Sequence, residues 1–283
     1  MTTSARHRRW PRLLAIGLLL ALALRFGLPA ALHAAGLHPD FARTERQLAG
    51  RRALVIATNH GELGPGGAPT GVALSELTVP YYEFLDAGLA VDVASPRGGR
   101  IPVDPQTLRW FMRTPADDRF LADAALQERL AHSRPVEELD FAAYDIVFLA
   151  GGWGAAYDLG VSDVLGRKIS DAWAAGRIVG GVCHGPLGLL RATDRDGQPL
   201  VRNRRLTAVT DKQVRELGID VTPQHPETEL RRAGARFESR SAFADLFANH
   251  VVVDGNLVTG QNQNAGGETA QRMLALLAAR RGT

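Results

Sequence analysis

The stretch that decides the fold runs from residue 177 to residue 190 and reads Arg-Ile-Val-Gly-Gly-Val-Cys-His-Gly-Pro-Leu-Gly-Leu-Leu. A β-branched run that stops at a glycine-flanked nucleophile is typical of a strand–elbow–helix turn, which holds a reactive side chain in a strained, exposed position. Cys183 is that side chain. Gly181 and Gly185 suit the elbow because neighbouring backbone comes too close there for a Cβ atom.

The chemistry of Cys183 depends on how easily its thiol ionises. A helix beginning near Gly185 points amide groups at the sulfur and favours the thiolate. Lowering a thiol pKa from ~8.5 to ~6 takes roughly 3.4 kcal/mol, whereas a helix terminus supplies only ~0.3–2 kcal/mol. Partners are therefore needed, and His184 is the first candidate. The alternative is a buried, inert cysteine between strand and helix.

Strands and helices alternate through the rest of the chain. Apolar runs at 53–57, 89–94 and 145–150 resemble strands buried on both faces, and 205–210 and 235–238 are further strand candidates. Helical patterns cover about 72–85, 118–130, 162–175 and 267–279, a loop and a helix are expected over 211–233, and 250–253 with 257–259 forms a hairpin. This order predicts an α/β fold, a flavodoxin-like doubly wound sandwich with a mostly parallel sheet and its site at the strands' C-terminal ends.

The charge of the chain is concentrated in its leader. Because the chain carries a net +3 and residues 1–36 contain five arginines and no acid, the remainder carries a net −2. Outside the leader the chain therefore has no excess positive charge that would favour binding to nucleic acid. The Arg-rich start and the apolar run 13–24 predict a signal peptide or membrane anchor over 1–36, a linker over 37–49 and one domain over 50–283.

Arginines before the apolar run predict an exported domain, either periplasmic or anchored on the non-cytoplasmic side of the membrane. The membrane is then contacted only through the N-terminal segment. One cysteine in an exported chain cannot form an internal disulfide, so the thiol needs another explanation.

Other residues near the predicted strand ends complete a possible site. Gly151 and Gly152 can present unobstructed amides and, with the His184 amide, form an oxyanion hole, although Gly-Gly also suits a simple tight turn. Asp211 can orient His184 as the third member of a Cys–His–acid set, or it can be an ordinary residue at a helix start. Glu216 is the rival acid.

Glu76 lies among apolar residues of the first predicted helix. If its carboxyl faces the sheet, burial raises its pKa and lets it exchange a proton with the site; if it faces outward, it is a solvated helix residue. His60 and Glu62, in a glycine-rich loop, either reach the same pocket or are loop residues with no role in the site. No paired His or Cys spacing predicts a metal, and the glycine-rich loop lacks the ending of a phosphate-binding loop, so no cofactor is expected.

Over residues 50–281 the chain resembles the ThiJ/PfpI superfamily, which has the class I glutamine amidotransferase-like fold, and within it the glyoxalase III and heat-shock chaperone branch. The resemblance is carried by seven motifs: Thr-Asn-His-Gly-Glu-Leu-Gly at 58–64, Ser-Glu-Leu with Pro-Tyr-Tyr at 75–82, Asp-Ala-Gly at 86–88, Ala-Ser-Pro-Arg-Gly-Gly at 94–99, Gly-Gly at 151–152, Val-Cys-His-Gly-Pro at 182–186, and the segment 251–262.

The resemblance implies a glyoxalase III-like enzyme with Cys183 as nucleophile, His184 as its partner and Glu76 as a proton-shuttling carboxyl. It implies conversion of methylglyoxal or a related dicarbonyl to a 2-hydroxy acid, without a cofactor. Relatives are also described as deglycases of glycated proteins, as holdase chaperones for unfolded proteins, and as homodimers. A redox-sensing stress protein and a cysteine peptidase or amidase are the alternatives.

The chain departs from this family at two places. Many similar members carry an adjacent glutamate pair where this chain has Asp-Lys-Gln-Val at 211–214, so the third triad residue stays open between Asp211 and Glu216. The leader is the second departure, since most relatives look cytoplasmic.

Overall fold

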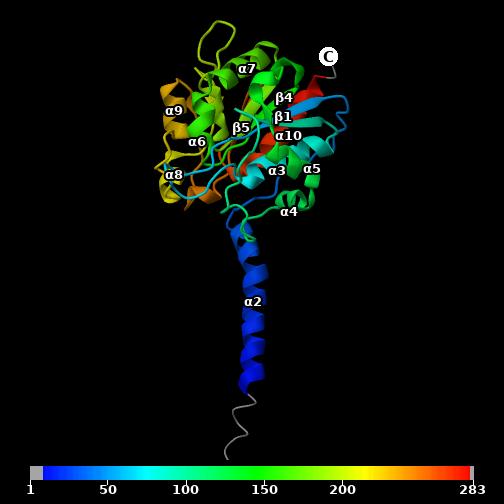
Figure 1. Ribbon diagram of the computed structural model, residues 1–283, viewed down its shortest axis with the longest axis vertical. Helices are drawn as coiled ribbons and strands as arrows, with labels where there is room; N and C mark the ends of the chain where they lie inside the picture. The colour runs from blue at the N-terminus through cyan, green and yellow to red at the C-terminus, as the bar shows by residue number, and fades with distance from the viewer. Residues whose placement is uncertain (1–8, 281–283) are drawn as a thin grey trace, which may run out of the picture.

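A seven-stranded sheet runs through the domain in the computed structural model, which describes residues 9–280 (Figure 1). Its order is β3-β2-β1-β4-β5-β9-β8, and all neighbours pair in parallel except β9 and β8. The strands are β1 Arg52–Ile56, β2 Ala90–Ser95, β3 Arg134–Pro135, β4 Ile146–Leu149, β5 Ile178–Val182, β8 Val251–Asp254 and β9 Leu257–Gly260. The predicted mostly parallel α/β fold is confirmed.

Helices cover both faces of this sheet because alternate strand residues point to opposite sides. Ala53 and Val55 of β1 join one core cluster, whereas Leu54 and Ile56 join the other. The first cluster lies under α3 Leu74–Asp86, α4 Pro115–Ala122, α5 Ala124–Ala131 and α10 Gly266–Ala279. The second lies under α6 Ala155–Asp158, α7 Asp163–Ala174, α9 Pro226–Arg232 and 3₁₀ helices η1 Val136–Glu138, η2 Phe141–Ala143 and η3 Leu159–Val161.

Most predicted elements appear near their predicted bounds. The helices expected at 72–85, 162–175 and 267–279 are α3, α7 and α10, and the expected hairpin is β8–β9. The segment 211–233 contains α8 Asp211–Glu216 and α9. The remaining 3₁₀ helices are η4 Gly185–Leu189, η5 Asp245–Phe247 and η6 Gln263–Ala265.

Two predictions were wrong in detail. The single helix expected over 118–130 is two helices, because Asp123 leaves helical geometry and its side chain caps α5 by accepting from the Leu126 amide. The strand expected over 205–210 is only β6 Arg205–Leu206, which pairs with β7 Arg236–Phe237 in a separate two-stranded sheet. The main sheet continues instead from β5 to β9, whose Thr259 hydroxyl accepts from the Thr207 amide.

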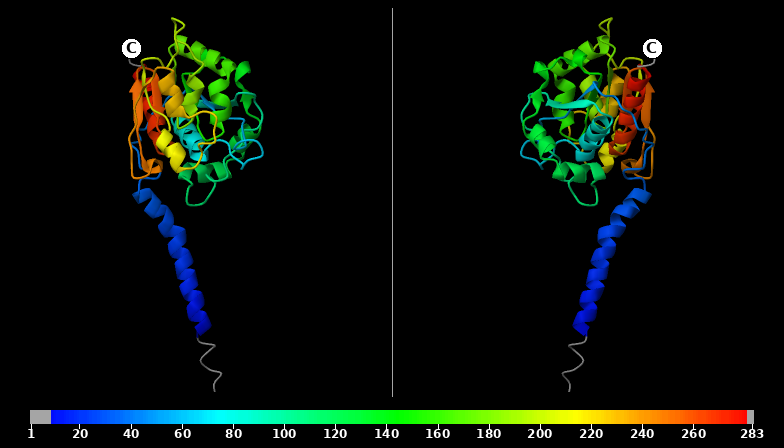
Figure 2. Two further views of the ribbon diagram at one scale, coloured as in Figure 1. Left: turned by 90° about the vertical axis from the view of Figure 1, so that its left-hand side faces the viewer. Right: turned by 90° about the vertical axis from the view of Figure 1, so that its right-hand side faces the viewer.

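Helix α2 Arg9–Ala34 projects from the domain as a separate rod (Figures 1 and 2). It is long and apolar enough to cross a membrane, although a signal sequence meets the same criteria. The following segment 37–49, which has no regular secondary structure, lies against the domain and buries Leu37 and Leu48. Arg43 in this segment donates to Glu83 of α3.

Candidate active site

The elbow at the end of β5 holds Cys183 in a left-handed backbone conformation, with φ of +59°. This conformation strains a non-glycine residue, and two backbone hydrogen bonds fix it: Cys183 N–H donates to Gly260 O at 3.1 Å and Cys183 O accepts from Val209 N at 3.1 Å. A Cβ atom at Gly185 would stand 2.1 Å from Leu149 O, so only glycine fits there. The predicted elbow is confirmed.

The helix expected after the elbow is the short 3₁₀ helix η4, not an α-helix. Pro186 and Gly188 within it disfavour α-helix, because proline lacks an N–H group and glycine costs backbone entropy. Five residues of 3₁₀ helix carry little macrodipole, so the expected support for the thiolate is weak.

Glu76 faces the elbow from the first turn of α3. Its side chain is buried, and a Cβ atom at Gly151 would stand 2.5 Å from its Oε2 atom. Burial raises the pKa of Glu76 to about 8, and its contacts with the Cys183 thiol and the Gly151 and Gly152 amides offset only part of that effect. The prediction of an inward carboxyl with a raised pKa is confirmed. At pH 7 this carboxyl is about nine-tenths protonated.

The thiol of Cys183 is harder to ionise than the sequence suggested. Burial raises its pKa well above the usual value, and the nearby Glu76 carboxyl adds to the rise. The amides of Gly152 and His184 oppose this rise but do not overcome it. The expectation of a thiolate in the resting protein was therefore wrong, because desolvation outweighs the pull of a few backbone dipoles.

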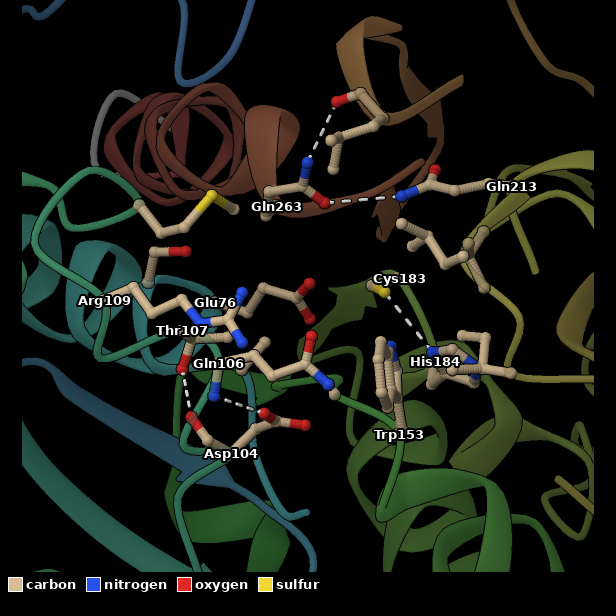
Figure 3. A pocket seen from close by; sticks show the side chains of 18 of the residues that line it. Glu76, Asp104, Gln106, Thr107, Arg109, Trp153, Cys183, His184, Gln213 and Gln263 are labelled. Atoms are coloured by element: carbon tan, nitrogen blue, oxygen red, sulfur yellow. Dashed lines mark hydrogen bonds between the residues drawn. The ribbon is translucent and has the colours of Figure 1, made fainter. Parts of the chain in front are cut away.

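His184 lies beside the sulfur with its ring fully buried. Its Nδ1 atom is 3.4 Å from Cys183 Sγ (Figure 3). Burial, together with the charge of His225, lowers the pKa of His184 to about 3, so the ring is neutral. A neutral imidazole at this distance can accept the thiol proton but cannot stabilise a thiolate by charge.

Neither proposed acid is hydrogen-bonded to His184. Among the described residues the His184 Nε2 atom has no partner. The Asp211 carboxylate accepts from Thr228 at 2.6 Å, and Glu216 accepts from the Asp245 amide at 2.7 Å. The structure thus brings Cys183, His184 and Glu76 together and leaves Asp211 and Glu216 outside the group.

The Gly-Gly turn after β4 reaches the same point. Gly151 lies against both Glu76 and the elbow, where an added Cβ atom would stand 2.7 Å from the His184 amide nitrogen. Gly152, with φ of +94°, directs its amide toward Cys183, as does the amide of His184. Amides aimed at the sulfur can also bind an oxyanion formed on a substrate attached to it.

These groups share a pocket of about 240 Å³ whose walls are largely apolar (Figure 3). Only 5% of Cys183 is exposed, so the sulfur lies at the base of this pocket. Trp153, Val209 and Leu217 belong to its apolar lining, and Gln213 and Gln263 line it as well.

His60 and Glu62 do not line this pocket. The His60 ring stacks on Tyr157 with centroids 3.9 Å apart, and Glu62 is exposed. Within residues 9–280, no group of three or more His, Cys, Asp or Glu side chains is arranged to hold a metal ion.

Asp104 and His38 are among the pocket residues that could not be predicted from the sequence. Asp104 is a buried carboxyl that accepts from Thr70 and from the Gln106 amide, and burial raises its pKa. An Asp-Pro step inside an apolar segment was its only signal in the sequence. His38 comes from the segment expected to be a linker, and its Nε2 atom donates to Met112 O at 2.9 Å on the pocket wall.

Two curated relatives with similar sequences are named as glyoxalases. The glutathione-independent glyoxalase HSP31 of Saccharomyces cerevisiae is 28% identical, and the match covers 81% of this chain and 99% of the relative. Glyoxalase 3 of Candida albicans is 27% identical, with 74% and 90% covered.

Two solved structures are similar to this chain in fold. The Rapid Encystment Protein 24 KDa of Francisella tularensis is 30% identical, with a TM-score of 0.75 and coverage of 80% of this chain and 99% of that one. The glyoxalase III structure from Candida albicans has a TM-score of 0.73 at 24% identity, with 80% and 97% covered. Residues 68–276 match the model of the DJ-1/PfpI family. With this match over most of its length, the chain belongs to the DJ-1/PfpI family.

Proposed function

We propose that this protein is a glutathione-independent glyoxalase that converts methylglyoxal or a related small dicarbonyl into a 2-hydroxy acid. The observation that carries the proposal is the buried Glu76 carboxyl facing the Cys183 thiol, with a pKa of about 8. A carboxyl that titrates near neutral pH can both take and return a proton during one turnover. The names of the yeast relatives support the same reaction.

The reaction begins when Cys183 adds to the aldehyde carbon of the substrate. The C–S bond forms as the thiol proton passes to His184 Nδ1, and the aldehyde oxygen becomes an oxyanion that the amides of Gly152 and His184 stabilise. The proton on His184 then neutralises this oxygen, which gives a hemithioacetal.

Proton transfer through Glu76 completes the chemistry. Glu76, in its ionised form, removes the hydrogen of the former aldehyde carbon, and the resulting enediol takes a proton back on the neighbouring carbon. The product is a 2-hydroxy thioester. Water cleaves the C–S bond, which releases the 2-hydroxy acid and restores the thiol, so the net reaction consumes one water and no redox partner.

Burial of the sulfur favours a free dicarbonyl over a modified protein as the substrate. With 5% of Cys183 exposed, a free dicarbonyl reaches the thiol more easily than a glycated side chain on a folded protein. Deglycase activity on glycated proteins and assembly into a homodimer are two further parts of this proposal. Turnover of glycated peptides tests the deglycase activity, and light scattering of the detergent-solubilised chain tests the homodimer.

The test follows methylglyoxal loss and lactate gain with the full chain purified in detergent. Cys183→Ser and Glu76→Gln are each expected to lower kcat at least 10³-fold. Glu83→Gln is the matched control, because Glu83 lies on the same helix but binds Arg43 and Gln271 away from the site. Turnover that survives either site substitution would remove the proposal.

A holdase or redox-sensing role predicts a different result for Glu76→Gln. Aggregation suppression by a surface does not need a titrating carboxyl at the base of a pocket, so Glu76→Gln is expected to leave that activity unchanged.

We also propose that α2 enters a membrane and that the domain lies on the non-cytoplasmic side. Its exposed apolar surface and the arginines before it support this placement. Fractionation of cells that express the full chain tests it, together with protease accessibility of the domain.

A further inference from the structure

Helix α2 exposes an apolar surface that no described part of the chain covers. Leu14, Leu19 and Leu20 are each 65–70% exposed, and the mean hydropathy of Leu13–Ala34 reaches 2.1 over an 18-residue window. A surface of this size is unfavourable in water and suits hydrocarbon. The apolar residues 13–24 alone span about 18 Å of helix.

The far end of α2 is attached to the domain beside the pocket. The Arg25 guanidinium lies 4.9 Å from the centre of the Trp110 ring, so the loop that carries Trp110 lies alongside the helix. Beyond the helix, the His38 ring is hydrogen-bonded to Met112 O on the same loop. The domain therefore lies alongside the C-terminal part of α2, from Arg25 to the end of the helix.

Aromatic side chains lie near the part of the helix that contacts the domain and near its end. We call Trp110, Phe111, Phe243 and Phe247 the aromatic collar. Trp110 and Phe111 meet edge to face, and Phe243 stacks on Phe247 with centroids 4.8 Å apart, although Phe243 is 78% exposed. An ideal Cβ atom on Gly36, just after the helix, would lie 2.9 Å from Phe247 O, so Trp110 contacts α2 at Arg25 and the backbone of Phe247 lies just beyond the end of the helix. Aromatic rings beside an arginine are typical of the boundary between lipid headgroups and acyl chains.

The Cys183 pocket is built from the same segments. Phe111 and Met112 of the loop, His38 after the helix, and Leu246 next to Phe247 all line it, and Leu217 and Ile219 add to its apolar lining. A three-carbon dicarbonyl needs little of its 240 Å³, and the polar groups of the lining, among them Arg109, Gln213 and Gln263, leave an apolar remainder that such a small molecule does not fill.

From these contacts we infer that the collar rests on the lipid surface and that the pocket takes a dicarbonyl carrying an alkyl chain, which enters from the membrane. The inference rests on the proposed glyoxalase chemistry and adds its substrate class. The carbonyl end reaches Cys183, and the alkyl chain lies along Leu217, Ile219 and Leu246.

The first test compares methylglyoxal with 2-oxooctanal, using the full chain in phosphatidylcholine vesicles. Each buried methylene is worth about fourfold in binding, so the five additional methylenes are expected to raise kcat/KM at least tenfold. Phe243→Ser is expected to lower kcat/KM for 2-oxooctanal at least threefold and to leave methylglyoxal turnover unchanged.

Leu85→Ser is the matched control, because Leu85 is also exposed but lies at the opposite end of α3 from Glu76. It should change neither rate. If methylglyoxal is converted but 2-oxooctanal is no better a substrate, the inference is wrong while the glyoxalase proposal stands. If neither dicarbonyl is converted, the proposed function itself fails.

The second test measures the depth of the collar independently of catalysis. Lipids brominated near the headgroup should quench the tryptophan fluorescence of the full chain, and Trp110→Phe should remove part of that quenching. Equal quenching in the two proteins would mean that Trp110 does not reach lipid, as expected if a second copy of the chain covers α2, and would overturn the inference.

Discussion

Replacing Glu76 with glutamine should make the protein more stable while it abolishes activity. The carboxyl is buried beside a second buried acid, Asp104, whose charge raises the Glu76 pKa further. An acid whose folded pKa lies above its unfolded pKa opposes folding once pH exceeds the unfolded value. Glutamine keeps the shape of the side chain and removes the titration.

The size of the effect follows from the shift of the Glu76 pKa from 4.5 to about 8. Below pH 4.5 both states are protonated and Glu76 costs nothing. The cost then grows by about 1.4 kcal/mol per pH unit and levels off above pH 8. Glu76→Gln is therefore expected to raise the free energy of unfolding by about 1 kcal/mol at pH 5, about 3 at pH 7 and about 4 at pH 8.

The assay is urea unfolding of the full chain in detergent at these three pH values, followed by tryptophan fluorescence. Glu83→Gln serves as the control, because Glu83 lies on the same helix but is paired with Arg43 away from Cys183. A stability difference between wild type and Glu76→Gln that stays flat from pH 5 to 8 would refute the argument that Glu76 is held neutral by burial.

Three further predictions follow from the elbow and its surroundings. Cys183→Gly should be about 1 kcal/mol more stable than Cys183→Ala in thermal melts, because only glycine adopts a φ of +59° without strain; equal melting temperatures would contradict a strained elbow. Gly151→Ala should lower methylglyoxal kcat at least 100-fold, since the added methyl group would lie 2.5 Å from the Glu76 carboxyl; near-normal kinetics would mean that the two groups do not pack together. Asp211→Asn should change kcat less than threefold, because its carboxylate is held by Thr228; a loss of 100-fold or more would restore Asp211 as the third member of a triad.

The strands of the main sheet could be predicted from the sequence because a strand buried on both faces is a continuous apolar run. Continuous apolar runs such as 53–57 have no other stable place than a strand covered on both faces, and the turn at 254–256 joins two strands directly. The same patterns could not show that 118–130 breaks at Asp123, since a capping aspartate looks like any polar residue on a helix surface.

The site was predictable where it depends on backbone geometry and less so where it depends on packing. The glycines around Cys183 and at 151–152 have few roles other than close approach, and the structure places them together. Asp104 and His38 come from segments without periodicity, and only the folded chain brings them to the pocket. The partner of His184 was likewise out of reach, because whether Asp211 turns toward His184 or Thr228 depends on where α9 packs.

The ionisation of Cys183 shows which physical effect dominates at this elbow. A helix terminus contributes about 0.3–1 kcal/mol toward a thiolate, whereas full burial can move a pKa by several units in the opposite direction. With Cys183 protonated, His184 neutral and Glu76 largely protonated at pH 7, the resting site carries little charge. Charge then arises only when an aldehyde meets the sulfur and the proton crosses 3.4 Å to His184. Since oxidants attack thiolates rather than thiols, the same arrangement protects Cys183 from oxidation while leaving it able to react.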